Sequence, residues 1–207
     1  VVVEQVVARD AHVREVQAAV VDAVEPALDA VVLTADARQE LARRGIPNRH
    51  EEGVHAVVDT HGSYAFGFLH VSKQPEAAVA VLHNDVLPFY DQLGLPVQAV
   101  LTDNGREFCG TERHPYELYL ALNDIEHRKT KVRSPRTNGF VERFNGTVLE
   151  EFFRPAMHQN LFASVEALQA ELDAWLHHYN HERPHLGYRN QGRRPWETVE
   201  RFVRQGG

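Results

Sequence analysis

The stretch VQAVLTDNG, residues 97–105, is the part of the sequence that most strongly indicates the fold. Its first six residues are mainly apolar and β-branched, which predicts a buried strand. Asp103 follows that strand directly, so its carboxylate is expected to project from the end of the strand into solvent. Asp-Asn-Gly is also a turn sequence favoured by local hydrogen bonds, and this structural interpretation of Asp103 stays open.

The segments on either side of this strand predict a mixed sheet flanked by helices, which places the chain in the α/β class. Upstream, the pattern predicts a hairpin from VHAVVD (54–59) and YAFGFLHVS (64–72), followed by a helix from about Pro75 to Gln92. Downstream, it predicts a short helix in HPYELYLALND (114–124), a short strand in IEHRKTK (125–131), a helix over about 139–153 and a long helix in SVEALQAELDAWLHHYN (164–180). Functional groups in such folds gather at strand ends and at the helices beside them.

Length and composition exclude several classes of protein. The chain has 207 residues, of which 43% are hydrophobic and 25% charged, values typical of a globular domain. The longest apolar runs are far shorter than the roughly 20 residues of a membrane span, and the first residues show no secretory signal, so we expect a cytoplasmic protein. A single cysteine, Cys109, excludes an internal disulfide framework and zinc sites built on several thiolates.

The first part of the chain differs in composition from the rest. All 10 Phe, 6 Tyr and 2 Trp lie at Tyr64 or beyond, and the preceding segment is rich in Val, Ala and acids. VREVQAAVVDAV (13–24) has apolar residues at helical spacing, which predicts helix. We therefore divide the chain into an atypical Val/Ala-rich helical segment over 1–53, a core over 54–190 and a C-terminal tail over 191–207.

Positive charge is concentrated even though the net charge is −7. The run HRKTKVRSPRTNGFVER, residues 127–143, holds six Lys or Arg and one acid, Glu142. Such a strip is expected where DNA phosphates bind, although a solvated surface has the same composition. A second cluster comprises Arg183, Arg189, Arg193 and Arg194.

Glu142 lies one turn into a predicted helix whose apolar stripe is Val141, Phe144, Val148 and Phe152. Alone it could be a solvated residue stabilised by the helix dipole. Together with a strand-end Asp103 and the basic strip, it suggests a site for Mg²⁺, which prefers a few carboxylate oxygens and keeps positions open for phosphate. Phosphodiester chemistry fits such a site, provided that a third carboxylate helps to hold the metal.

Three motifs, LTDNGREF (101–108), SPRTNGFVERFNGT (134–147) and YNHERPHLGYRNQGRRP (179–195), resemble the integrase catalytic core of bacterial insertion-sequence transposases. These proteins are related to retroviral integrases and have a ribonuclease-H-like fold. The resemblance implies such a mixed sheet with a C-terminal helical extension, and Mg²⁺- or Mn²⁺-dependent cleavage and strand transfer on double-stranded DNA. It also implies multimers on DNA and no membrane.

In that family the metal is held by an Asp-Asp-Glu triad. Asp103 matches the second Asp and Glu142 the Glu, with 38 residues between them. We expect DNA contacts from Lys129, Lys131, Arg133, Arg136 and Arg143 of the basic strip, and from Arg183 of the late motif. The alternatives are an inactive transposase remnant that only binds DNA, and a nuclease that cleaves without joining.

The first Asp of the triad is left unassigned. Asp59 ends a strand but matches a family position that is not catalytic, and Asp36 lies in a helical, charged context. The change in composition motivates the hypothesis that the segment before about Gly53 is truncated or translated out of frame. Codons for GIPNRHEEG (45–53), read one base further on, are compatible with Glu-Tyr-Leu-Ile-Gly-Thr-Lys-Lys-Gly, a strand-like sequence.

Overall fold

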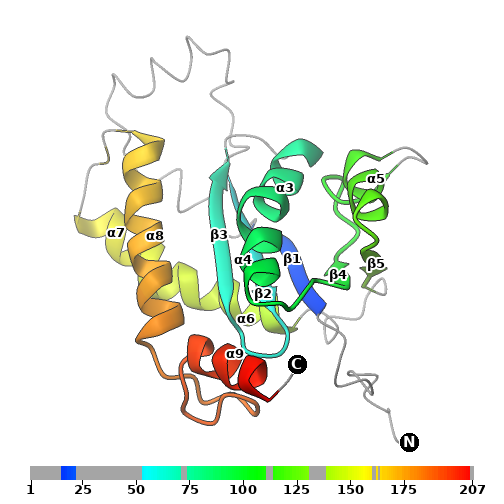
Figure 1. The fold of residues 1–207 in the computed structure, drawn as a ribbon. Helices are drawn as coiled ribbons and strands as arrows, with labels where there is room; N and C mark the ends of the chain where they lie inside the picture. The colour runs from blue at the N-terminus through cyan, green and yellow to red at the C-terminus, as the bar shows by residue number, and fades with distance from the viewer. Residues whose placement is uncertain are drawn as a thin grey trace, which may run out of the picture.

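The structure is a computed structural model that describes residues 15–21, 53–70, 74–110, 114–130, 139–159, 162 and 164–205 (Figure 1). Its strands are β1 (Glu15–Val21), β2 (Gly53–Asp59), β3 (Ala65–His70), β4 (Ala99–Thr102) and β5 (Glu126–Lys129). Its helical elements are α3 (Pro75–Val81), η2 (Leu82–Val86), α4 (Leu87–Gln92), α5 (Pro115–Leu122), α6 (Gly139–Val148), η4 (Leu149–Phe153), α7 (Arg154–Gln159), α8 (Val165–His181) and α9 (Pro195–Arg204). The hairpin, the helices and the short strands predicted beyond residue 53 are therefore confirmed.

The five strands form one mixed sheet in the order β3-β2-β1-β4-β5. β2 pairs antiparallel with both β1 and β3, whereas β4 runs parallel to β1 and to β5. The parallel connections pass through helices, as parallel strands require. The carboxyl ends of β1, β4 and β5 consequently lie at the same edge of the sheet.

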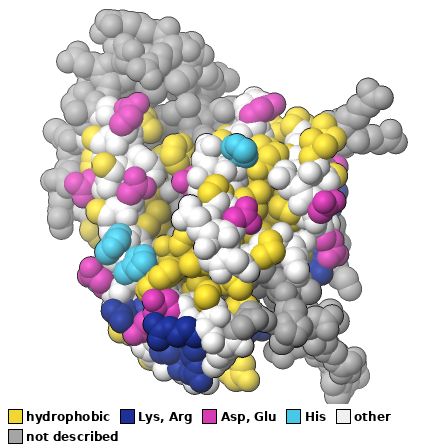
Figure 2. Space-filling model, viewed as in Figure 1, with side chains coloured by type: hydrophobic (Ala, Val, Ile, Leu, Met, Phe, Trp, Pro, Cys, Tyr) yellow, Lys and Arg dark blue, Asp and Glu magenta, His cyan; other side chains and the backbone are white. Residues whose placement is uncertain are grey.

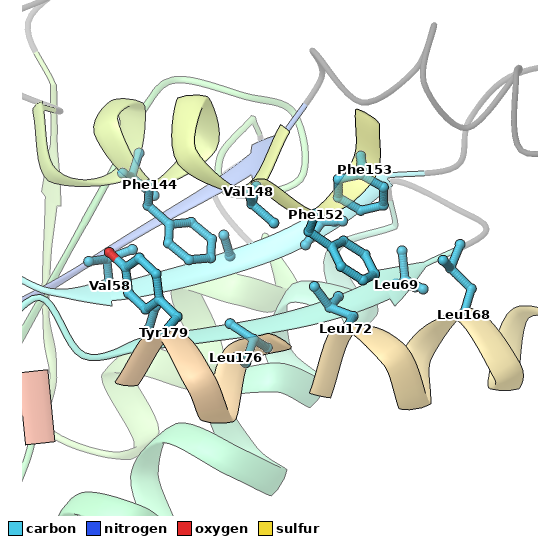
Figure 3. Close-up of a cluster of buried hydrophobic side chains, with 14 of the residues drawn as sticks. Val58, Leu69, Phe144, Val148, Phe152, Phe153, Leu168, Leu172, Leu176 and Tyr179 are labelled. Carbon is cyan, nitrogen blue, oxygen red and sulfur yellow. The ribbon is translucent and has the colours of Figure 1, made fainter. Parts of the chain in front are cut away.

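Hydrophobic cores lie on both faces of the sheet, and β2 contributes to both. Val54, Ala56 and Val58 point into a core formed with α6, η4 and α8, and the intervening Val57 points into a core with α3, η2, α4 and α5. This alternation follows from the two-residue period of a strand. Figure 1 shows α3 and α4 in front of the sheet and α6 behind it, and Figure 3 shows the aromatic and leucine side chains of the first core.

The prediction that the N-terminal segment is helical is wrong for residues 15–21, which form the central strand of the sheet. Val16 is fully buried between Asp59 of β2 and Val100 of β4, the residues with which it pairs. Short runs of Val and Ala fit either a helix or a strand, and here two neighbouring strands supply the hydrogen bonds. The remainder of residues 1–52 lies outside the described residues.

The outer edge of β3 is covered by side chains of α8. Asn180 accepts a hydrogen bond from the Ala65 N–H (2.9 Å) and donates one to the Ala65 carbonyl (2.8 Å), as a neighbouring strand would. Gln169 accepts from Leu69 N–H at 2.7 Å in the same way. Gly67 lets α8 approach closely, since a Cβ there would lie 3.4 Å from the Leu176 side chain. The edge is thus protected from pairing with other chains.

We predict that Asn180→Leu lowers the free energy of unfolding by about 2 to 4 kcal/mol, because each buried polar group left unpaired costs about 1–3 kcal/mol. Urea unfolding followed by circular dichroism measures the loss. His178→Ala, on the exposed side of the same helix, is the matched control. Equal stability of the two variants would show that Asn180 does not hold this edge.

The C-terminal residues pack back onto the β2–β3 turn. Asp59 is buried and accepts hydrogen bonds from the backbone N–H groups of His61 and Gly62 at 2.9 Å, which gives it a structural role in this turn. Asn190 donates to the Gly62 carbonyl at 2.8 Å. The predicted helical extension corresponds to α9, which follows this loop. No helix in the described part of the chain is long and apolar enough to cross a membrane.

Candidate active site at the end of β4

Asp103 lies at the carboxyl end of β4, as predicted, and begins a tight turn. Its Oδ1 accepts a hydrogen bond from Gly105 N–H at 2.8 Å, so the turn interpretation of this residue is confirmed. The turn is fixed to β5, because Asn104 Nδ2 donates to the Thr130 carbonyl at 3.1 Å and Thr130 N–H donates to the Thr102 carbonyl at 2.9 Å. Asp103 is half-buried, and its hydrogen bond to Gly105 holds its carboxylate in place at the carboxyl end of β4.

A polar chain that the sequence did not reveal lies beside Asp103. Thr102 Oγ1 is 2.9 Å from His127 Nε2, and His127 Nδ1 is 3.6 Å from Glu117 Oε1. Lys129 Nζ donates to the same Glu117 oxygen at 2.5 Å. Burial, and secondarily Lys129, lowers the pKa of His127, whereas the hydrogen bond to Lys129 lowers the pKa of Glu117. Lys129 therefore neutralises Glu117 and is less available to DNA than its sequence position suggested.

Glu142 lies in the first turn of α6 and is exposed. Its neighbours Val141 and Phe144 are buried in the core. Their burial fixes the rotation of α6 about its axis, so that Glu142 faces away from the core. α6 packs against β2 and β1, and β1 is the strand next to β4. Asn145, one turn later, has a buried Oδ1 without a hydrogen-bond partner among the described residues, and this oxygen is a further potential ligand.

The strand beside Asp103 brings no third carboxylate. Ala18 of β1 pairs with Thr102, which places Ala18 and the next residue, Ala19, level with the end of β4. The acid of β1, Glu15, pairs with Ala99 at the opposite end. Among the described residues, no three His, Cys, Asp or Glu side chains are grouped so that they could hold a metal ion. Asp103 and Glu142 are therefore candidate ligands for a divalent cation, and the described residues bring no complete ligand set together.

The predicted DNA-contacting residues have different surroundings. Arg143 is exposed on α6, with its guanidinium carbon 5.5 Å from the Phe140 ring centroid. Arg183 is paired with Glu151 through two hydrogen bonds of 2.9 and 2.5 Å. Lys131, Arg133 and Arg136 lie outside the described residues.

The late YNHERPH motif is structural for most of its length. Tyr179 is buried in the core, and His185 packs edge-on against its ring at 4.5 Å between centroids. Burial, together with the nearby Arg183, lowers the pKa of His185 to about 4 from its ordinary 6.5. His127 and His181 shift in the same direction, also mainly through burial.

These shifts predict that stability falls with acidification. A histidine whose pKa is lower in the folded state binds more protons when unfolded, so for His185 the loss runs from about pH 6.5 down to about pH 4. We expect His185→Phe, which keeps a ring but cannot titrate, to reduce the difference in urea midpoint between about pH 7 and about pH 5. His127 and His181 should leave a residual slope. An unchanged pH dependence in His185→Phe would contradict this assignment.

The fold and part of the sequence resemble those of integrase catalytic cores. Residues 123–191 match the model of the integrase core domain family. The structure resembles the integrase catalytic core of bovine immunodeficiency virus with a TM-score of 0.58 and 15% identity, covering 93% of this chain and 97% of that one. It also resembles the HTLV-2 integrase catalytic core solved with magnesium, with a TM-score of 0.56 and 17% identity over 89% and 95% of the two chains. The predicted ribonuclease-H-like fold is confirmed.

Relatives with similar sequences carry names of the same kind. A Spiroplasma virus protein named as an integrase is 26% identical over 141 residues, 64% of this chain and 38% of the relative. The Escherichia coli transposase InsD of insertion element IS2 is 33% identical over 94 residues, 44% of this chain and 28% of the relative. The resemblance predicted from the three motifs is thus confirmed. The matched regions span well under half the length of these relatives.

Proposed function

We propose that this chain acts on double-stranded DNA in integration or transposition, with Asp103 and Glu142 as the acidic residues of its site. The observation that carries the proposal is the placement of Asp103 at the carboxyl end of β4 in an integrase-type core. Glu142 is exposed on α6, a helix that packs on the strand adjacent to β4. Both side chains come from rigid elements and are accessible to a large substrate.

In this proposal Asp103 and Glu142 hold Mg²⁺ or Mn²⁺, and the amide oxygen of Asn145 is a nearby candidate ligand. Such an ion, when bound, favours attack on a phosphodiester by stabilising the attacking and leaving oxygens. The protein's own contribution is positional. Gly105 N–H directs one oxygen of Asp103, which leaves Oδ2 without a hydrogen-bond partner among the described residues. Arg143, one residue after Glu142 and exposed, is available to hold a phosphate nearby.

DNA joining tests the proposal. A labelled duplex with a free 3′-hydroxyl is incubated with supercoiled plasmid and Mg²⁺ or Mn²⁺, and transfer of the label to the plasmid is measured together with nicking. We expect transfer that Glu142→Gln removes while Glu150→Gln, at an exposed position on the following segment, retains it. Nicking without transfer would instead indicate a nuclease that only hydrolyses.

Joining two DNA ends generally requires more than one protomer, so we propose that copies of this chain assemble on DNA. Light scattering of the protein with and without a duplex measures this. A stoichiometry of one chain per DNA at saturation would exclude it.

A second candidate function is DNA binding without joining, and the sequence of β1 favours it. Ala18 and Ala19 are the β1 residues level with Thr102 and Asp103, and neither can supply a carboxylate. If the chain needs a third ligand, wild type binds duplex DNA but transfers no strand.

A further inference from the structure

The loop between α8 and α9, residues 182–194, is held in one conformation by its own hydrogen bonds; we call it the Tyr188 loop. His185 N–H donates to the Arg193 carbonyl at 3.0 Å, and Gly192 N–H donates to the His185 carbonyl at 2.8 Å. Asn190 is buried and donates to Gly62 at 2.8 Å, which ties the loop to the β2–β3 turn. The backbone of the loop is therefore ordered before any partner binds. Binding a partner then carries no entropic cost for ordering the loop.

This ordered loop holds two large apolar side chains in water. Leu186 is 92% exposed and Tyr188 is 89% exposed, more than any other large hydrophobic residue in the described part of the chain. A single exposed leucine needs no explanation. An exposed leucine and an exposed tyrosine two residues apart, on a loop whose neighbouring residues are anchored, have the features of a contact surface.

The surroundings of the Tyr188 loop are positively charged although the chain is acidic. Residues 182–205 contain six Arg and three Glu, which gives this segment a net charge of +3. Because the whole chain has a net charge of −7, the remaining residues together carry −10. Figure 2 shows Lys and Arg side chains gathered at the lower end of this face, where Figure 1 places the loop and α9. The field at this end of the molecule thus favours a polyanion.

We propose that the Tyr188 loop is a DNA contact separate from the Asp103 site, in which the Tyr188 ring stacks on an unpaired base and Leu186 packs beside it. The proposal rests on the proposed function only in taking DNA as the ligand. An exposed aromatic ring within a positive surface is the arrangement that binds single-stranded nucleic acid without reading its sequence. A second copy of the chain is a poorer partner, because a symmetric contact through this loop would bring two positive surfaces together.

The test is fluorescence anisotropy with two DNAs, a blunt duplex and the same duplex with a single-stranded overhang. We expect Tyr188→Ala to weaken binding of the overhang DNA by about tenfold, the effect of losing one base–aromatic stack, and to change blunt-duplex binding by less than about twofold. Tyr188→Phe keeps the ring and should bind as wild type does. Leu122→Ala, at another exposed position (75%) on α5, is the matched control and should change neither affinity.

Four results overturn the proposal. Unchanged binding of the overhang DNA by Tyr188→Ala excludes stacking, while an equal loss in Tyr188→Phe points to the hydroxyl and not the ring. A shift from dimer to monomer in Tyr188→Ala, measured by light scattering without DNA, assigns the loop to self-association. Failure of wild type to bind either DNA would instead contradict the proposed function as well, so the two failures are distinguishable.

Discussion

Asp103→Asn is expected to reduce metal-dependent DNA cleavage by at least about 100-fold, since even the outer partners of metal ligands are worth about 10- to 100-fold. The substitution is unusually specific. An asparagine Oδ1 can still accept the hydrogen bond from Gly105 N–H, so the turn after β4 is preserved and the negative charge is removed. Conversion of supercoiled plasmid to nicked circles in Mn²⁺ measures the rate.

Asp91→Asn, an exposed acid near the end of α4, is the control for loss of one negative charge. It should cleave at the wild-type rate. If Asp103→Asn still cleaves DNA, Asp103 is not a residue of the site. Its role is then only to stabilise the turn after β4. If wild type binds plasmid without nicking it, the second candidate function, DNA binding alone, is the correct one.

Phe144→Ala is expected to have the largest effect on stability, about 3 to 5 kcal/mol, which is the usual cost of removing a buried Phe side chain. Phe144 is 1% exposed and its ring packs against Tyr179 and Trp175, with centroids 5.3 and 6.1 Å away. Figure 3 shows it between α6 and α8. The loss is a large fraction of the roughly 5–15 kcal/mol that stabilises an ordinary domain.

Urea unfolding followed by tryptophan fluorescence measures this loss, because Trp175 lies beside the cavity that the substitution creates. Arg143→Ala, one residue earlier and exposed, is expected to change stability by no more than about 0.5 kcal/mol. Because Phe144 fixes the rotation of α6, Phe144→Ala should also impair any activity that depends on Glu142. A stability equal to that of Arg143→Ala would mean that α6 is not anchored as described.

The elements beyond residue 53 could be predicted because their local signals agree with their final environment. The buried apolar strand pattern of residues 54–59 and the proline-initiated helix at Pro75 each indicate one structure. β1 could not be predicted in this way. Its Val and Ala residues are compatible with helix, and its strand conformation comes from hydrogen bonds to β2 and β4, which are distant in sequence.

The sequence predicted which elements carry the candidate site residues, but it did not predict the contacts that these elements make with one another. A strand-end Asp103 and a first-turn Glu142 follow from local patterns, and the structure places both residues on those elements. The pairing of Lys129 with Glu117 and of Arg183 with Glu151 depends on how elements pack together. The same is true of Asn180, whose bonds to Ala65 cross 115 residues of sequence. Long-range ion pairs and amide bonds of this kind leave no local signal.

The central claim is that Asp103 and Glu142 meet at one divalent cation, and titration with Mn²⁺ monitored by electron paramagnetic resonance tests it most directly. Asp103→Asn and Glu142→Gln are each expected to weaken Mn²⁺ binding by about tenfold or more. The double variant should lose much less than the product of the two effects, because residues that share one site are coupled. Two losses that combine independently, or Mn²⁺ binding that neither variant changes, would contradict the claim.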